Sequence, residues 1–178
     1  MLAQIYLEAV KREFINTKRL ADKAMAQISD EDFFFEPNSQ SNSIATIIKH
    51  MHGNMISRWT DFRTTDGEKP TRNRDTEFEQ IFYTDKDDFL DKWEAGWKCF
   101  LDALNSIRPE ELENKIFIRG EEYTILGALE RQTSHYGYHA GQIVYLARFL
   151  AKKNWVSLSI PRGKSEEFNK DFFAKNKK

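Results

Sequence analysis

The sequence predicts an all-α protein with a four-helix bundle, and three observations support this prediction. Four long segments carry apolar residues at steps of three and four, which places those residues on one face of a helix. The first of these segments contains no Pro or Gly, and a strand-like pattern is confined to one short segment. At 178 residues the chain has the length of one domain, so we expect a single domain over residues 1–178.

The first predicted helix runs from about Leu2 to Ile28. The second helix is expected to begin after the polar cluster 41–43, whose side-chain oxygens can accept hydrogen bonds from the first free amides of a helix. This second helix is expected to reach Phe62. Its apolar face is formed by Ile44, Ile47, Ile48, Met51 and Met55.

A long polar segment from Thr64 to Tyr83 separates the second and third predicted helices. A loop of this length in a compact domain is more often functional than idle. The third helix is expected to begin near Thr84, where a Thr-x-x-Asp spacing resembles a capping box, and to end at the Arg-Pro pair 108–109. Residues 115–123 are expected to form a short extended segment or hairpin that turns near Gly120.

The fourth predicted helix runs from about Thr124 to Lys152, with apolar residues on the face expected to be buried. Pro161 and Gly163 then interrupt the chain, and a short C-terminal helix is expected from Ser165 to Ala174. Four amphipathic segments joined in this way are typical of an antiparallel or crossover bundle.

The composition excludes several classes of function. The net charge is −1, which provides no basic excess for the phosphates of nucleic acid. The one cysteine, Cys99, cannot form an internal disulfide. The chain contains no run of about 18 apolar residues and no signal-peptide pattern at its start. We therefore expect a cytoplasmic protein without nucleic-acid or membrane partners.

Two of the four histidines, His135 and His139, lie four residues apart in the fourth predicted helix. Residues at this spacing lie on the same face about one turn apart, so both imidazoles can reach one metal ion. The spacing alone is weak evidence, because pairs of helical histidines are more often surface residues or hydrogen-bonded core residues. A third ligand from another helix is needed to make a metal site convincing.

Four further residues in the fourth helix favour such a site. Gln132 and Gln142 are expected on the same side as the histidines, and buried polar groups need a partner, which a metal site would supply. Gly137 and Gly141 are unfavourable inside a helix, and their presence indicates that another group approaches the backbone closely.

The second predicted helix offers His50 and His52 as the third ligand. His52 lies nearer the centre of the apolar stripe, whereas His50 lies on its flank. Periodicity therefore slightly favours His52, but a bundle interior is wider than one stripe, so both histidines remain candidates.

The segments SIATIIKHMHGN (residues 43–54) and HYGYHAGQI (residues 135–143) resemble the second and fourth helices of the DinB-like (YfiT-like) metalloenzymes. More narrowly, residues 54–62, 66–69 and 158–165 resemble an uncharacterised bacterial subgroup of that superfamily. The resemblance covers nearly the whole chain and implies a four-helix bundle of the DinB-like type. It also implies the metal ligands His50, His135 and His139, and thereby selects His50 over His52.

Three neutral imidazoles suit zinc, nickel or ferrous iron, and we favour zinc. Three protein ligands leave a position for water or substrate, and an open zinc site lowers the pKa of a bound water or thiol. The resemblance to thiol-dependent S-transferases and hydrolase-like relatives implies a metal-dependent transferase or hydrolase acting on a small molecule, with a low-molecular-weight thiol as the co-substrate in the transferase version. The alternative is a non-catalytic, stress-associated or binding protein in which the metal stabilises the bundle.

The sequence does not identify a general base. Asp61, Asp66 and Glu68 are candidates, although solvated loop carboxylates are the commoner explanation. Arg58 could recognise an anionic substrate or pair with an acidic side chain. Gln142 could orient a metal ligand.

The remaining expectations concern Cys99 and assembly. Cys99 lies among aromatic residues of the third helix and is expected to be buried packing rather than a nucleophile. We expect a homodimer, because related bundles often pair and Trp155, Phe172 and Phe173 could contribute to an interface. A third hypothesis, a helical interaction module, predicts no bound metal at all.

Overall fold

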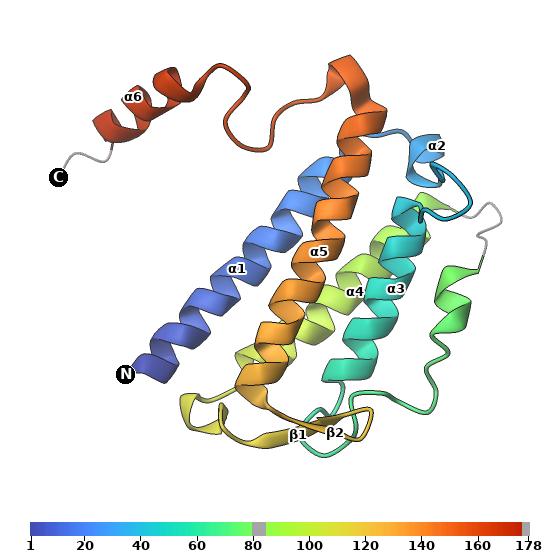
Figure 1. Cartoon of the computed structure of the whole chain (residues 1–178), viewed down its shortest axis with the longest axis vertical. Helices are drawn as coiled ribbons and strands as arrows, with labels where there is room; N and C mark the ends of the chain where they lie inside the picture. The colour runs from blue at the N-terminus through green and yellow to red at the C-terminus, as the bar shows by residue number, and fades with distance from the viewer. Residues whose placement is uncertain (80–84, 176–178) are drawn as a thin grey trace.

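The computed structural model describes residues 1–79 and 85–175, and it confirms a mostly helical protein. Figure 1 shows four long helices that lie side by side as a bundle. They are α1 (Leu2–Met25), α3 (Ile44–Trp59), α4 (Lys86–Asn105) and α5 (Ile125–Ala151). Helix α3 packs mainly against α4, and α1 packs mainly against α5.

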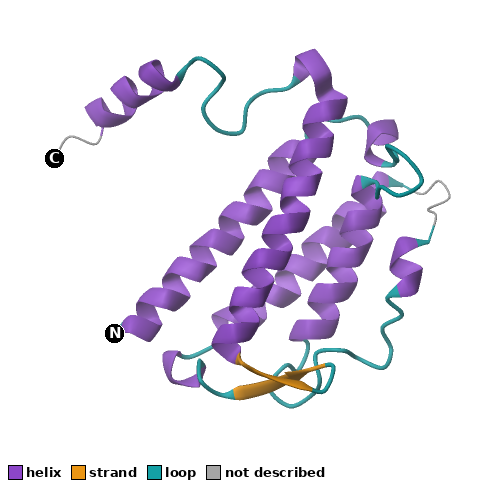
Figure 2. Ribbon diagram, in the orientation of Figure 1, coloured by secondary structure: helices purple, strands orange, loops and turns teal. Residues whose placement is uncertain are grey.

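Short elements connect the long helices (Figure 2). They are α2 (Asp30–Phe33), the 3-10 helices η1 (Asp75–Phe78), η2 (Pro109–Glu111) and η3 (Lys152–Asn154), and the strands β1 (Lys115–Ile118) and β2 (Glu121–Thr124). The two strands pair antiparallel with Ile118 opposite Glu121, and residues 119 and 120 between them both have positive φ angles, 59° and 74°. Such a pair of angles is that of a two-residue hairpin turn, so the expected hairpin near Gly120 is confirmed.

The ends of the long helices differ slightly from the predicted ones. Helix α3 begins where expected, because the Ser43 side chain accepts a hydrogen bond from the amide of Thr46. It ends at Trp59 rather than Phe62, since Thr60 has an extended ψ of 123° and Asp61 a φ of 48°, neither of which a helix accommodates. Helix α1 ends at Met25 rather than Ile28.

The start of α4 was predicted near Thr84, which lies outside the described residues. Within them, the side chain of Asp85 accepts a hydrogen bond from the amide of Asp87 and caps the helix. Helix α4 ends at Asn105, before the Arg-Pro pair at 108–109 that was expected to end it.

Aromatic rings fill the centre of the bundle. The ring centroids of Phe14 and Phe100 are 4.5 Å apart, and those of Phe100 and Tyr136 are 5.2 Å apart, each pair in an edge-to-face arrangement. Trp97 packs against the same cluster and is fully buried. Because these residues come from α1, α4 and α5, one aromatic cluster joins three of the long helices.

The C-terminal helix α6 (Ser165–Lys175) projects away from the four long helices (Figure 1). It begins where the short C-terminal helix was predicted, and the aromatic side chains of Phe168 and Phe173 on it are exposed. Among the described residues, none of the helices combines the length and the apolar character needed to cross a lipid bilayer.

Candidate metal centre

Three histidines converge between α3 and α5. The Nε2 atom of His135 lies 3.3 Å from Nε2 of His50 and 3.2 Å from Nε2 of His139. One ligand atom of each residue lies within 4.8 Å of the others, so the cluster is compatible with a metal site. His50 and His139 are buried, with 5% and 7% of their surface exposed.

His52 lies outside this cluster. Residues 50 and 52 differ by about 200° around a helix, so their side chains leave α3 on nearly opposite sides. The Nδ1 atom of His52 is 2.9 Å from the backbone oxygen of Lys92 in α4. A Cβ atom on Gly96 would lie 3.2 Å from Cα of His52, which shows how closely α4 approaches this side. Periodicity slightly favoured His52 as the histidine that faces α5, and this prediction is wrong, because His50 faces α5 and His52 faces α4.

Hydrogen bonds orient two of the three rings. The Nδ1 atom of His50 lies 2.8 Å from Oε2 of Glu77, and Nδ1 of His139 lies 2.8 Å from Oε1 of Gln142. Both oxygens are acceptors, so each Nδ1 carries the proton and donates it. The lone pair of each Nε2 then points towards the third histidine. Gln142 therefore orients His139, as expected from the sequence.

His135 is held differently. Its Nε2 contacts both other rings, but its buried Nδ1 has no hydrogen-bond partner within residues 1–79 and 85–175. The contacts of Nε2 and packing against Tyr136 therefore orient this ring, which is tilted against the ring of Tyr136 with their centroids 5.7 Å apart.

The electrostatics of the cluster leave two of its three rings uncharged at neutral pH. Burial, together with the charge of the neighbouring histidines, lowers the pKa of His135 to about 3 and that of His139 to about 4. These two rings are therefore neutral at pH 7. Their Nε2 atoms lie 3.2 Å apart, and neutral imidazoles of this kind can act as ligands of a divalent cation.

Glu77 is a residue that sequence reasoning missed. It lies in η1, in the second half of the long loop between α3 and α4, and it is 6% exposed. Arg72 donates two hydrogen bonds to its carboxylate, from Nε to Oε1 at 2.8 Å and from Nη2 to Oε2 at 2.9 Å. Burial raises the pKa of Glu77, but the hydrogen bonds from His50 and Arg72 outweigh this and lower it.

The buried Gln132 has a partner other than a metal. Its Nε2 donates to Oδ1 of Asn54 at 3.0 Å and to the hydroxyl of Tyr136 at 3.2 Å. The hydroxyl of Tyr136 also accepts a hydrogen bond from Nε1 of Trp59 at 3.2 Å. This buried network connects α3 to α5. Gln132 therefore has hydrogen-bond partners within the protein, and its burial does not require a metal site.

The two glycines of α5 also differ from expectation. Gly137 and Gly141 are exposed, and no described atom lies within 4 Å of where a Cβ would stand on either residue, outside the helix's own backbone. The close approach that they were taken to indicate is instead found at Gly53 in α3. A Cβ there would lie 2.9 Å from the carboxyl carbon of Glu77.

Among the described residues, none of the candidate general bases Asp61, Asp66 and Glu68 forms a hydrogen bond with a clustered histidine. Asp66 accepts hydrogen bonds from the backbone amides of Arg119 and Gly120, at 2.8 and 2.7 Å, and so holds the hairpin turn. Glu68 accepts a hydrogen bond from the buried Arg58 at 2.8 Å. Of the two roles considered for Arg58, pairing with an acidic side chain is the one observed.

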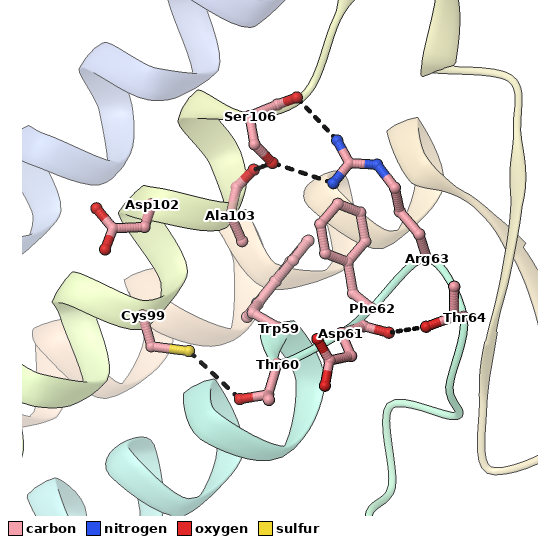
Figure 3. A pocket seen from close by; sticks show the side chains of 10 residues that line it. All are labelled: Trp59, Thr60, Asp61, Phe62, Arg63, Thr64, Cys99, Asp102, Ala103 and Ser106. Carbon is pink, nitrogen blue, oxygen red and sulfur yellow. Dashed lines mark hydrogen bonds between the residues drawn. The ribbon is translucent and has the colours of Figure 1, made fainter.

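A cavity of about 500 Å³ lies between the end of α3 and α4 (Figure 3). Asp61 and Cys99 line it, and the Sγ atom of Cys99 lies 3.6 Å from Oγ1 of Thr60. Cys99 is therefore half-buried at a cavity wall, not fully packed as expected. None of the three clustered histidines lines this cavity, and its Arg63 is already bonded to Ser106.

The described residues thus define a helical bundle protein with a buried three-histidine cluster that could hold a metal ion. Residues 1–164 match the family described as protein of unknown function (DUF1572), and the chain belongs to this family. Helix α6 begins immediately after the matched residues. A comparison with curated proteins found no match.

Proposed function

We propose that the protein is a divalent-metal-dependent enzyme of the DinB-like superfamily in which His50, His135 and His139 bind the ion. The observation that carries this proposal is the convergence of three Nε2 atoms from two separate helices. Two of the rings are held by hydrogen bonds that Nδ1, the atom that faces away from the centre, donates to Glu77 or Gln142. This is the arrangement that orients histidine ligands in metalloproteins.

Three histidine ligands favour zinc, with nickel and ferrous iron as the other candidates, and leave at least one coordination position for a small molecule. Zinc in such a site supplies a water or thiol of lowered pKa as the nucleophile. We therefore propose a reaction of the S-transferase or hydrolase class, with a low-molecular-weight thiol as co-substrate in the transferase.

Aromatic side chains flank the proposed centre on two sides. The ring centroid of Phe78 lies 4.9 Å from that of His50, and the ring centroid of Tyr138 lies 5.0 Å from that of His139. Tyr138 is 62% exposed, whereas His139 beside it is only 7% exposed. A small substrate with an apolar part would contact these rings, whose faces and edges suit such groups.

No described carboxylate other than Glu77 hydrogen-bonds to the three clustered histidines. Glu77 is bonded to the far side of the His50 ring and to Arg72, so it does not face a substrate bound at the Nε2 side. The residues of the chain therefore position the ligands, and we assign the general base to none of them.

A second candidate is a non-catalytic, stress-associated or binding protein in which the ion stabilises the bundle. The observation that favours it is that His50 comes from α3 and the other two histidines come from α5. A shared ion would cross-link two helices that otherwise meet through few residues, and the energy of metal binding would add to the stability of the fold.

The test compares His50→Ala, His135→Ala and His139→Ala with the control His52→Ala, whose ring bonds to α4 instead. Metal content is measured by mass spectrometry after growth in supplemented medium. We expect one equivalent of metal in the wild type and in His52→Ala, and a large loss in the other three variants. Metal-free wild-type protein, or equal loss in His52→Ala, would contradict the proposed ligand set.

Activity and stability then separate the two candidate functions. Thiol transfer to electrophilic substrates and hydrolysis of an ester panel are measured for the same variants, together with unfolding in urea. Loss of activity without a large loss of stability supports the enzyme. A large loss of stability, with no activity in the metal-loaded wild type, supports the structural role.

A further inference from the structure

Gly53 lies in the middle of α3, where its backbone has ordinary helical geometry. Glycine at such a position is unfavourable relative to alanine, and the backbone does not require it. The reason lies in the neighbouring loop, because a Cβ on residue 53 would stand 2.9 Å from Cδ of Glu77 and closer still to its Oε1. Any larger residue would displace the carboxylate from α3.

The Glu77 carboxylate that occupies this space accepts hydrogen bonds from His50 on one side and from Arg72 on the other. Its Oε2 accepts from Nδ1 of His50 at 2.8 Å, and both of its oxygens accept from Arg72, whose side chain is 5% exposed. Lys49 of α3 also donates to the backbone oxygen of Thr76, the residue before Glu77. Two contacts, from His50 to Glu77 and from Lys49 to Thr76, therefore hold this part of the loop against α3, and Arg72 fixes the carboxylate from within the loop.

We infer that Glu77 is a positioning residue for the proposed metal centre, with Gly53 giving its carboxylate access to His50 and Arg72 holding the carboxylate in place. This inference rests on the proposed function, since it assigns a role towards the bound ion. Glu77 fixes the proton of His50 on Nδ1, keeps the Nε2 lone pair directed at His135 and His139, and increases the electron density of the ring. Each of these effects strengthens the bond from Nε2 to a cation.

A purely structural role for Glu77 predicts something different. In that case the carboxylate only ties the loop to α3, and its loss lowers the stability of the metal-free protein without changing the affinity for zinc. Zinc affinity therefore separates the two roles. It is measured on metal-free protein by competition with a chromophoric chelator, a measurement that needs no knowledge of the substrate.

We expect Glu77→Ala to weaken zinc binding by about 10- to 100-fold, the range observed when such outer ligands are removed. Glu77→Gln keeps an acceptor oxygen but removes the charge, so its affinity should lie between those of the wild type and Glu77→Ala. Gly53→Ala should weaken binding by a factor close to that of Glu77→Ala. The matched control is Gly141→Ala, a helical glycine near which no described atom would contact the added Cβ, and it should bind zinc like the wild type.

The double variant Gly53→Ala/Glu77→Ala provides the sharpest test. The methyl group at residue 53 acts only by displacing the Glu77 carboxylate, so the double variant should bind zinc no more weakly than Glu77→Ala. If the loss of zinc affinity in the double variant equals the product of the losses in the two single variants, the inference is overturned, because Gly53 would then act independently of Glu77.

The outcomes also distinguish this inference from the proposed function. Zinc binding that is lost in His135→Ala but retained at wild-type affinity in Glu77→Ala overturns the inference and leaves the metal centre intact. Wild-type protein that binds no zinc overturns both. Circular dichroism of each metal-free variant establishes that the helical fold is retained, and Glu77→Gln provides a test if Glu77→Ala does not fold.

Discussion

Replacing Tyr136 by phenylalanine should destabilise the bundle through one specific atom. The hydroxyl of Tyr136 is fully buried, and it accepts hydrogen bonds from Nε1 of Trp59 and Nε2 of Gln132 at 3.2 Å each. Phenylalanine keeps the ring that packs against Phe100 and removes only this oxygen. Gln132 retains its bond to Asn54 at 3.0 Å, but its other N–H and the indole N–H of Trp59 both lose the acceptor that they have among the described residues. The hydroxyl also donates to Oδ1 of Asn54 at 3.3 Å, and this bond is lost as well.

The expected cost of Tyr136→Phe follows from this count. Two buried N–H groups, the indole N–H of Trp59 and one of the two on the Gln132 amide, are left without an acceptor. Each costs about 1–3 kcal/mol, so we expect a loss of at least about 2 kcal/mol in the free energy of unfolding. Urea unfolding followed by circular dichroism measures it. Tyr138→Phe, on the same helix but 62% exposed, is the control and should change stability by less than about 0.5 kcal/mol. A loss in Tyr136→Phe as small as that of the control would refute the reasoning.

Three further predictions concern pH, the metal and assembly. Hydrogen bonds from Arg63 and from the amide of Arg108 lower the pKa of Glu111 to about 2, so its contribution to stability is present above the ordinary pKa near 4.5 and is lost as the pH falls towards 2. Glu111→Gln should therefore cost about 1–2 kcal/mol in urea unfolding at pH 7 and progressively less below pH 4.5, whereas a cost independent of pH would contradict this assignment. Zinc at 100 times its dissociation constant should stabilise the wild type by about 2.7 kcal/mol and raise Tm by about 5–11 °C in calorimetry, and a chelator should reverse the shift. The same shift in His50→Ala would exclude that residue as a ligand. Light scattering at micromolar concentration should give twice the chain mass of 21.0 kDa, and a monomer mass would end the homodimer proposal.

Local features of the fold were predictable because local chemistry determines them. Ser43 caps α3 as its residue type suggests, and the positive φ of Gly120 allows the hairpin turn. The early end of α3 was not predictable in this way. The apolar pattern continues to Phe62, and the side chain of Phe62 is indeed buried, but the residue lies in the loop after the helix.

The choice between His50 and His52 shows where periodicity fails. A hydrophobic stripe identifies the buried face of a helix only when the opposite face meets solvent. Twelve of the sixteen residues of α3 are buried, because α4 covers one side while α5 and the loop cover others. Both histidines therefore point towards protein, and the stripe does not distinguish the side that faces α5. The family resemblance selected His50, the histidine that the structure places beside His135 and His139.

Glu77 could not be found from local pattern, since it is separated from His50 by 27 residues and lies in a polar loop. Two signals nevertheless pointed towards it. The length of the loop indicated a function, and Gly53 is a helical glycine in the turn after His50. The glycines that drew attention instead, Gly137 and Gly141, lie on the exposed face of α5. Sequence shows that a glycine is present in a helix, but only the fold shows whether anything occupies the space it leaves.

The loop also explains how the buried carboxylate of Glu77 can be kept charged beside the ring of His50. Arg72 pairs with Glu77 and contacts Glu68 at 3.4 Å, and Glu68 in turn pairs with Arg58 of α3. Charges of alternating sign thus extend from His50 to the far end of the same helix, and each acid is bonded to at least one arginine. A buried carboxylate without such partners would take up a proton and lose most of its pull on the Nδ1 proton of His50. The polar loop thus returns along α3 and brings both Arg72 and Glu77 to the level of His50.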